Sequence, residues 1–480
     1  IHTASLPSPD CPDLTSTQSR TRVQRFHIMV QTRSSSRARV AAEMATAKKQ
    51  KAEEETAMEF GGPLGAAIGF IALPVMVYYL WICARFYHGL AYPQELSIEG
   101  FKLFGRTMVD HVLDDGLPTV RTTVLYVGWV FFQAILAVVC PGKIVKGAVL
   151  SDGKTQLDYL CNGLCTWWIT LATVLSLHLT GYFRLSELAD CYAPLMTTAS
   201  VFATVLSVLC WTSAHMNGRT ERMTGNLVYD FFMGAELNPR LGKLFDIKMF
   251  VEIRPGIKLW FLLTAGFAMK QYELHGAVSS PMLCLCLFHF VYANSCFKGE
   301  ECIPRSMDII YEKFGWMLCW ANLVWVPFTY CVPSLYLLHT APFEPSLWYT
   351  GAVLAIYALG YWIFDDANAQ KDLFRLDPNY LIWGREKPKF LQTKRGTKLL
   401  ISGFWGVSRH INYLGDILQA WCFGLVCTFG SVIPYFYAVY LTALLIHRER
   451  RDNYDCQRKY GDDWEKYCKL VPARIVPFLY

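Results

Sequence analysis

About ten apolar runs, each close to the length of a membrane-crossing helix, most strongly constrain the fold of this chain. A helix needs about 20 residues to cross the ~30 Å hydrocarbon core of a bilayer. A long stretch from 416 to 446, interrupted by Gly430 and Pro434, provides one or two of these runs. The others lie at 63–83, 122–140, 160–182, 190–211, 257–271, 276–297, 314–338 and 347–365. We therefore predict an all-α fold, a polytopic membrane helix bundle of about ten transmembrane helices.

The composition supports this fold class. Of the 480 residues, 53% are apolar and only 18% are charged, which is more apolar than an ordinary soluble domain. Most of the 17 cysteines lie inside the apolar runs, as Cys284, Cys286, Cys319 and Cys427 do, and there they pack as small hydrophobic residues. The sequence has no pair of close CxxC motifs with attendant histidines, so we predict no metal site.

The first 58 residues differ from the rest of the chain. They are polar, rich in serine and threonine, and basic up to the first apolar run. We predict that 1–58 form a disordered basic arm, because they hold too few apolar residues for a core. Residues 59–480 then form the transmembrane domain, and positive charge beside its first run predicts a cytosolic N-terminus. No basic stripe marks the folded part beyond the arm and the cofactor segments, so nucleic acid is not favoured as a partner.

Polar segments in the last third carry the groups that a charged cofactor needs. In 365–400, Lys371 and Arg375 are four residues apart and share one face if this stretch is helical. A solvated cationic face is the alternative interpretation. The tail from His447 combines cations for phosphates, aromatic planes for a base and an acid for a ribose hydroxyl. GxGxxG and Walker sequences are absent, so we predict a non-Rossmann cofactor pocket in the C-terminal half, about 276–480.

Two other segments also indicate more than plain loops. Residues 219–255 mix charges with aromatic side chains, which predicts a folded loop that packs on the bundle or covers a cavity. Residues 409–416, RHINYLGD, directly adjoin an apolar run. Polar groups at a bilayer boundary are costly unless they are partnered, so this segment predicts a site. In the tail, Arg448 and Asp452 are four residues apart, and a simple helical ion pair is the alternative account of them.

Several separated motifs resemble one known family. They are EFGGPLGA at 59–66, GAELNPRLG at 234–242, EIRPG at 252–256, SMDII at 306–310, VWVPFTY at 324–330, ANAQK at 367–371 and SGFWGVSRHINYLGD at 402–416. Together they resemble the sterol reductases, the family of the sterol C14, C7 and C24(28) reductases and of the lamin B receptor's reductase domain. The EFGGPLG opening, Glu252 and the PFLY at the end resemble the C14 branch more than the C7 branch. SGFWGVSRH is equally at home in the C7 branch.

The resemblance implies a multi-pass enzyme of the endoplasmic reticulum membrane, with the nuclear envelope as a second location. It would use NADPH to reduce a sterol ring double bond, C14=C15 of Δ8,14-sterols in the C14 branch; the Δ7 bond is the alternative. An isolated alkene does not accept hydride, so a proton reaches C15 first and the C14 cation, stabilised by the Δ8 bond, then takes the hydride. This order needs an acid in an apolar pocket with little water. The oligomeric state stays open.

The family pattern places Tyr292 and Asp416 as proton donor or relay. An interfacial aromatic residue is the alternative for Tyr292, and a helix-start cap is the alternative for Asp416. Lys371 and Arg375 would bind the 2′-phosphate, and Trp405 and Tyr413 would stack on rings. The full set implied for NADPH is Lys371, Arg375, Leu400, Trp405, Asn412, Tyr413, Asp452, Cys456, Tyr460 and Tyr467, with Arg409, His410, Arg448 and Lys459 nearby.

Departures from the family pattern concern the substrate side more than the cofactor side. They are Asp365-Asp366, Ala321-Asn322, Ser295 and Ile411. Two other classes share some features of the chain. The RHxNYxG element and the basic, aromatic tail also resemble isoprenylcysteine and phospholipid methyltransferases, which bind S-adenosylmethionine, but those chains are shorter and carry paired glutamates where Arg451-Asp452 lies. A non-catalytic membrane scaffold would need a chromatin-binding domain, for which the arm is too short.

Overall fold

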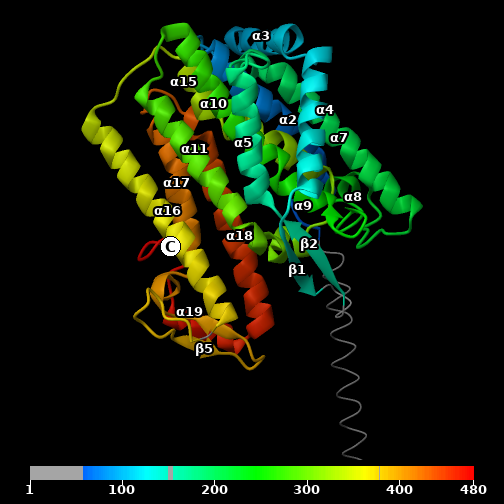
Figure 1. Cartoon of the computed structure of the whole chain (residues 1–480), viewed down its shortest axis with the longest axis vertical. Helices are drawn as coiled ribbons and strands as arrows, with labels where there is room; N and C mark the ends of the chain where they lie inside the picture. Colours follow the sequence, from blue (N-terminus) through cyan, green and yellow to red (C-terminus); the bar gives the residue numbers. More distant parts are fainter. Residues whose placement is uncertain (1–57, 150–154, 378) are drawn as a thin grey trace, which may run out of the picture. The chain divides into compact units, whose positions relative to one another are not determined.

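The described part of the chain is helical, with three short β-hairpins (Figure 1). The computed structural model describes residues 58–149, 155–377 and 379–480. Most of the predicted arm, 1–57, lies outside them. The three antiparallel hairpins are β1 (Lys143–Val149) with β2 (Gln156–Cys161), β3 (Arg240–Leu241) with β4 (Phe245–Asp246), and β5 (Phe390–Gln392) with β6 (Lys398–Leu400).

The helices follow one another through the whole described chain. Short 3-10 or π segments are η1 (Glu300–Arg305), η2 (Ala321–Trp325), η3 (Gly403–Gly406) and η4 (Ile433–Tyr435). The α-helices are α2 (Gly62–Phe86), α3 (Ile98–Asp115), α4 (Val120–Val139), α5 (Gly163–Leu179), α6 (Glu187–Asp190), α7 (Tyr192–Met216), α8 (Leu227–Met233), α9 (Ile247–Ile253), α10 (Pro255–His275), α11 (Ser280–Lys298), α12 (Met307–Ile310), α13 (Trp316–Trp320), α14 (Val326–Thr329), α15 (Val332–His339), α16 (Leu347–Leu376), α17 (Ile411–Leu425), α18 (Phe436–Tyr460) and α19 (Asp462–Leu470).

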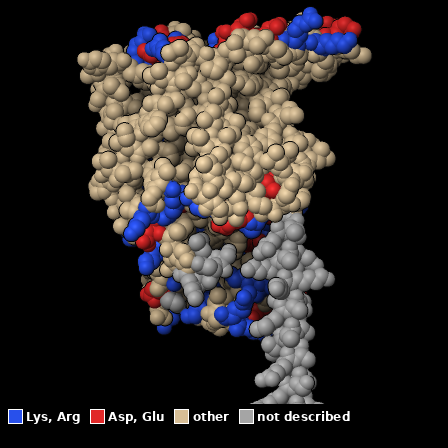
Figure 2. Space-filling view, turned by 90° about the vertical axis from the view of Figure 1, so that its right-hand side faces the viewer, with Lys and Arg blue, Asp and Glu red and all other residues tan. Residues whose placement is uncertain are grey.

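Six helical stretches of the described residues are long and apolar enough to cross a membrane. They are α2, α4, α7, α11, the composite Trp316–His339 and α16. Charged side chains gather at two opposite ends of the face drawn in Figure 2, and an almost uncharged band separates them. Such a band matches the hydrocarbon layer of a bilayer. The predicted all-α polytopic membrane fold is confirmed, and the count of about ten spans stays a prediction.

The composite helix Trp316–His339 is broken by prolines. Pro327 lies in the first turn of α14 and Pro333 in the first turn of α15, and neither residue has a backbone N–H for a helical hydrogen bond. The π turn η2 precedes the first break. Gly256 of α10 packs here so closely that a Cβ atom would lie 1.9 Å from the Asn322 carbonyl oxygen. The backbone at the start of α10 therefore packs directly against the backbone of η2.

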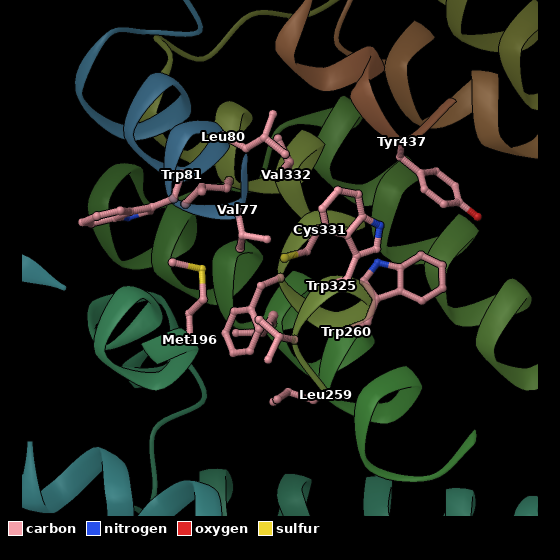
Figure 3. Close-up of a cluster of buried hydrophobic side chains, with 14 of the residues drawn as sticks. Val77, Leu80, Trp81, Met196, Leu259, Trp260, Trp325, Cys331, Val332 and Tyr437 are labelled. Atoms are coloured by element: carbon pink, nitrogen blue, oxygen red, sulfur yellow. The ribbon is translucent and has the colours of Figure 1, made fainter. Parts of the chain in front are cut away.

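Side chains from distant parts of the sequence fill the core around this break. Figure 3 shows Trp81 of α2, Met196 of α7, Trp260 of α10 and Trp325 of η2 in one cluster of buried side chains. Trp81 and Trp260 are fully buried. The predicted folding of 219–255 is also confirmed, because α8, the β3–β4 hairpin and α9 occupy this segment.

In the C-terminal half of the chain, α17 packs against α16 and against α18 (Figure 1). The contact between α16 and α17 depends on two glycines. A Cβ atom at Gly415 would lie 2.7 Å from the Gly360 carbonyl oxygen and 2.6 Å from the Phe364 nitrogen. Small residues at such a crossing let two backbones meet inside a membrane. This contact fixes the position of the residues that follow Gly415.

A buried polar cluster lies between α4, α5, α10 and η1. Arg254 and Glu300 form an ion pair whose side chains are only 4% and 3% exposed. Lys258, one turn into α10, donates to Gln133 Oε1 at 2.7 Å and to Thr166 Oγ1 at 2.8 Å. Every charge in this cluster thus has a polar partner, as burial requires.

Breaking the buried pair is expected to destabilise the fold strongly. Glu300→Gln leaves the Arg254 guanidinium buried with reduced compensation, so the free energy of unfolding falls by about 3–5 kcal/mol. The exposed pair Lys143–Glu301 is the matched control, and Glu301→Gln costs less than about 1 kcal/mol. Unfolding of the purified protein in detergent micelles measures both changes. Equal losses for the two variants would contradict this account.

Candidate functional site

The predicted proton groups, Tyr292 and Asp416, meet across two helices. The Tyr292 hydroxyl of α11 donates to Asp416 Oδ1 of α17 at 3.0 Å, although 124 positions separate them in sequence. The Tyr292 ring packs edge-on against Trp260, with ring centroids 5.4 Å apart. Asp416 lies inside α17, which begins at Ile411, so the alternative of a helix-start cap is wrong. The structure therefore joins a phenol and a carboxyl group in partly buried surroundings.

The end of α16 carries the two predicted phosphate-binding cations. Helix α16 continues to Leu376, so Lys371 and Arg375 share one helical face as predicted. Lys371 Nζ lies 4.0 Å from the ring centroid of Trp405. Arg375 is exposed and forms an ion pair with Asp372 at 3.5 Å. One cation is thus held on an aromatic ring and the other faces outward.

Trp405 belongs to a small core beneath this end of α16. It is 3% exposed, and its indole nitrogen donates to the Ala367 carbonyl oxygen at 2.7 Å. Leu400, at the end of β6, packs in the same cluster with Phe374. Lys371 already covers the Trp405 ring on which a cofactor ring was predicted to stack. In this structure Trp405 and Leu400 belong to the buried cluster against which this end of α16 packs.

The segment before α17 is held in place by the last residues of the chain. The backbone N–H of Arg409 donates to Ala473 O at 3.0 Å, and that of His410 donates to Arg474 O at 2.9 Å. The Arg409 guanidinium donates to Cys468 Sγ and to Asn453 Oδ1. These contacts set the direction in which the side chains of 409–413 leave the backbone.

His410 and Tyr413 form a ring stack at the start of α17. Their ring centroids are 4.9 Å apart and the planes differ by 21°. His410 Nε2 lies 3.5 Å from Asp452 Oδ2 of α18. Burial, together with the smaller effect of the nearby cations Lys371, Arg409 and Arg448, lowers the pKa of His410 to about 3. The imidazole is therefore neutral at physiological pH, and its contact with Asp452 is no ion pair.

Two buried polar atoms of this segment lack a hydrogen-bond partner among the described residues. Asn412 Nδ2 donates to Asn368 Oδ1 at 3.1 Å, but Asn412 Oδ1 is unpartnered. Arg409 Nε is unpartnered as well. Buried polar atoms are paired in most proteins, so unpaired ones suit a polar ligand.

Helix α18 and helix α19 supply the other predicted residues. Arg448 forms an ion pair with Asp308 at 3.6 Å. An ion pair with Asp452 within the same helix is therefore not enough to explain its position. Cys456 Sγ lies 3.8 Å from Asp452 Oδ2, and Lys459 Nζ lies 5.2 Å from the Tyr460 ring centroid. Tyr460 stacks on Trp464, and Trp464 contacts the buried Tyr467. These residues form one wall beside α16 and α17.

The two predicted sets adjoin each other through Tyr413 and Arg448. The charges of Asp416, Asp452 and Arg448 act on the Tyr413 hydroxyl. Asp452 and Cys456 likewise interact electrostatically with the Lys371 ammonium group. The structure therefore brings the Tyr292–Asp416 pair and the cationic set into one continuous region, while Arg375 lies at its outer edge.

Sequence reasoning missed some partners in this region. Asn368, Glu312, Asn453 and Cys468 hold predicted residues through the contacts Asn368–Asn412, Glu312–Arg451, Asn453–Arg409 and Cys468–Arg409. Each pair joins segments at least 44 residues apart, so no local spacing indicates it. A covarying pair of columns would be the signal that could have found them.

A cavity of about 670 Å³ lies elsewhere, between α4, the β3–β4 hairpin and α9. Phe131, Ile135, Val138 and Phe250 line it, whereas Tyr292 and Asp416 do not. It is mostly apolar, and the buried Arg254 reaches its wall. The candidate site is therefore defined by the Tyr292–Asp416 contact and its neighbours, and not by this cavity.

The neutral state of His410 makes stability depend on pH. Its folded pKa of about 3 lies below the ordinary 6.5, so stability is present above pH 6.5 and is lost as the pH falls toward 3. Between pH 7.5 and 5 this amounts to about 2 kcal/mol. His410→Gln is expected to remove that part of the slope in unfolding measured against pH. The exposed His275→Gln, as control, retains the wild-type slope; an unchanged slope in His410→Gln would contradict the assignment.

Comparisons with known proteins identify the family of the chain. A family model described as the ergosterol biosynthesis ERG4/ERG24 family matches residues 54–480. A Delta(14)-sterol reductase of Dictyostelium discoideum is 43% identical over 428 residues, which cover 88% of this chain and 92% of the relative. One of Methylotuvimicrobium alcaliphilum is 45% identical over 412 residues, 85% of this chain and 93% of the relative. A Delta(24(24(1)))-sterol reductase of Aspergillus fumigatus is 37% identical over 433 residues, 87% of this chain and 92% of the relative. The chain belongs to the ERG4/ERG24 sterol reductase family.

Proposed function

We propose that this protein is a sterol reductase of sterol biosynthesis that reduces the C14=C15 bond of Δ8,14-sterols with NADPH. The observation that carries the proposal is the Tyr292–Asp416 hydrogen bond beside a set of cations and aromatic rings. The names of the Dictyostelium and Methylotuvimicrobium relatives support the C14 bond over the other sterol bonds. The membrane of the endoplasmic reticulum is the proposed location, with the N-terminus in the cytosol.

The residues around His410 suit NADPH in charge and shape. Lys371 and Arg375 would hold the 2′-phosphate, since cations distinguish this extra charge. Asp452 would accept from a ribose hydroxyl, and the unpartnered Asn412 Oδ1 would accept from an amide group. Tyr413 offers an aromatic plane next to Asp416. NADPH, when bound, supplies the hydride.

Tyr292 and Asp416 have the chemistry to move a proton to the alkene. The phenol has one proton, and in this structure it is donated to Asp416 Oδ1. Proton delivery to C15 therefore requires that Asp416 be protonated, so that it can give its own proton or release that of Tyr292. The nearby rings of Trp260 and Phe423 exclude water from the pair. Without water, the C14 cation formed next persists until hydride reaches it.

Removal of the proposed phosphate-binding cations is expected to weaken the binding of NADPH but not that of NADH. Lys371→Ala raises the KM for NADPH by about 10-fold or more, because a charge-assisted contact is lost. Arg375→Ala has a smaller effect, since its side chain is more exposed. The KM for NADH, which lacks the 2′-phosphate, stays near its wild-type value. Arg385→Ala, an exposed cation of the next loop, is the control. Steady-state kinetics in microsomes would refute these roles if NADPH and NADH responded alike.

Loss of the proton groups is expected to stop reduction without loss of cofactor. Tyr292→Phe and Asp416→Asn lower the rate by about 10²- to 10⁴-fold and leave NADPH affinity unchanged. Tyr349→Phe is the matched control, because its partly buried hydroxyl donates to Leu425 O, outside the site. Expression in cells that lack C14 reductase, with sterol profiling by mass spectrometry, measures the outcome. Rescue of Δ7 rather than Δ14 intermediates would assign the other branch, and no rescue would refute the proposal.

A further inference from the structure

A fully buried histidine lies one helical turn before Tyr292 on α11. His289 is 0% exposed, and its Nδ1 lies 2.8 Å from Thr264 Oγ1 of α10. Thr264 Oγ1 also donates to the Trp260 carbonyl oxygen at 3.2 Å. When the hydroxyl proton of Thr264 goes to the Trp260 carbonyl oxygen, the imidazole donates its Nδ1–H to Thr264 Oγ1. This chain of bonds fixes the tautomer of His289.

The fixed tautomer leaves a bare lone pair at His289 Nε2. This atom is buried and has no hydrogen-bond partner among the residues that the structure describes. The indole nitrogen of Trp260, also fully buried, is a donor without a partner there. The two rings touch, with centroids 4.7 Å apart. Two rings in contact thus each carry a buried nitrogen without a partner, an acceptor on His289 and a donor on Trp260.

A hydroxyl group can form a hydrogen bond with each of the two nitrogen atoms. It donates its proton to Nε2 and accepts the indole N–H through its oxygen, whereas a carbonyl group satisfies only the indole. The surroundings are otherwise aromatic: Phe423 packs edge-on against His289, with ring centroids 4.6 Å apart, and Trp260 contacts Tyr292 and Tyr437 (Figure 3 shows Trp260 and Tyr437). A rigid apolar molecule with one hydroxyl suits this combination.

We infer that Trp260 and His289 form a subsite for the hydroxyl group of the sterol. The inference rests on the proposed function, because that function makes the substrate an alcohol with four fused rings. Trp260 contacts both His289 and Tyr292, so the subsite adjoins the Tyr292–Asp416 pair. The subsite selects the end of the sterol that enters, and the proton pair then meets the ring double bond.

The test compares substrates that differ only at this hydroxyl. Equilibrium binding to the purified protein is measured for a Δ8,14-sterol, its deoxy analogue and its ketone. Wild type binds the sterol about 10- to 100-fold more tightly than the deoxy analogue. His289→Leu loses that preference, while its affinity for the deoxy analogue and the ketone stays within about twofold of wild type. Trp260→Phe lowers affinity for both the sterol and the ketone, because both accept from the indole.

Two further variants keep the test decisive if His289→Leu does not fold. His289→Gln retains an acceptor near the Nε2 position and is expected to restore part of the preference for the sterol. Thr264→Val removes the group that fixes the tautomer and is expected to reduce the preference. Equal losses on sterol, ketone and deoxy analogue would overturn the subsite, since that result indicates a packing role or a bound water. Binding does not depend on turnover, so failure of NADPH-dependent reduction would be seen separately in wild type.

Discussion

The candidate site depends on the direct packing of two helix backbones, α16 on α17, at Gly360 and Gly415. No side chain larger than hydrogen fits at this crossing. The next residue, Asp416, is thereby carried to Tyr292, and Asn412, about one turn earlier, is carried to Asn368. A single interhelical distance thus sets both the proton pair and the polar groups around His410. Hydrophobic burial alone would not fix it so closely, because lipid is as apolar as the helix surfaces.

The apolar runs of the sequence locate most helices well, because length and composition alone decide which segments can cross a bilayer. They locate the start of α17 poorly. The run begins at Asp416, whereas the helix begins at Ile411. Its first turn includes Asn412 and Tyr413 beside the buried Ile411. The backbone of 409–410 is held by Ala473 and Arg474, contacts that no local pattern indicates.

Polar groups at the start of an apolar run indicated a site in 409–416, but only the family resemblance paired Tyr292 with Asp416. Tyr292 and Asp416 lie 124 positions apart, and neither periodicity nor spacing connects them. The resemblance named both, yet it left the environment of each residue undetermined. Trp405, predicted to stack on a ring, is buried, and Lys371 lies over its ring. His289 gave no signal at all, because a histidine in an apolar run is most often a satisfied core residue, and its unpaired nitrogen is visible only in three dimensions.

The contact of Gly256 with Asn322 couples a remote position to this chemistry. Helix α10 begins at Pro255 and carries Lys258, Trp260 and Thr264 within its first turns. Its N-terminal end rests on the carbonyl oxygen of a π turn, a surface that does not yield as a flexible side chain would. A methyl group at residue 256 would therefore push the N-terminal end of α10 away from η2 and change the orientation of the Trp260 indole. The space at residue 256 therefore bears on the position of Trp260 as well as on the local fit.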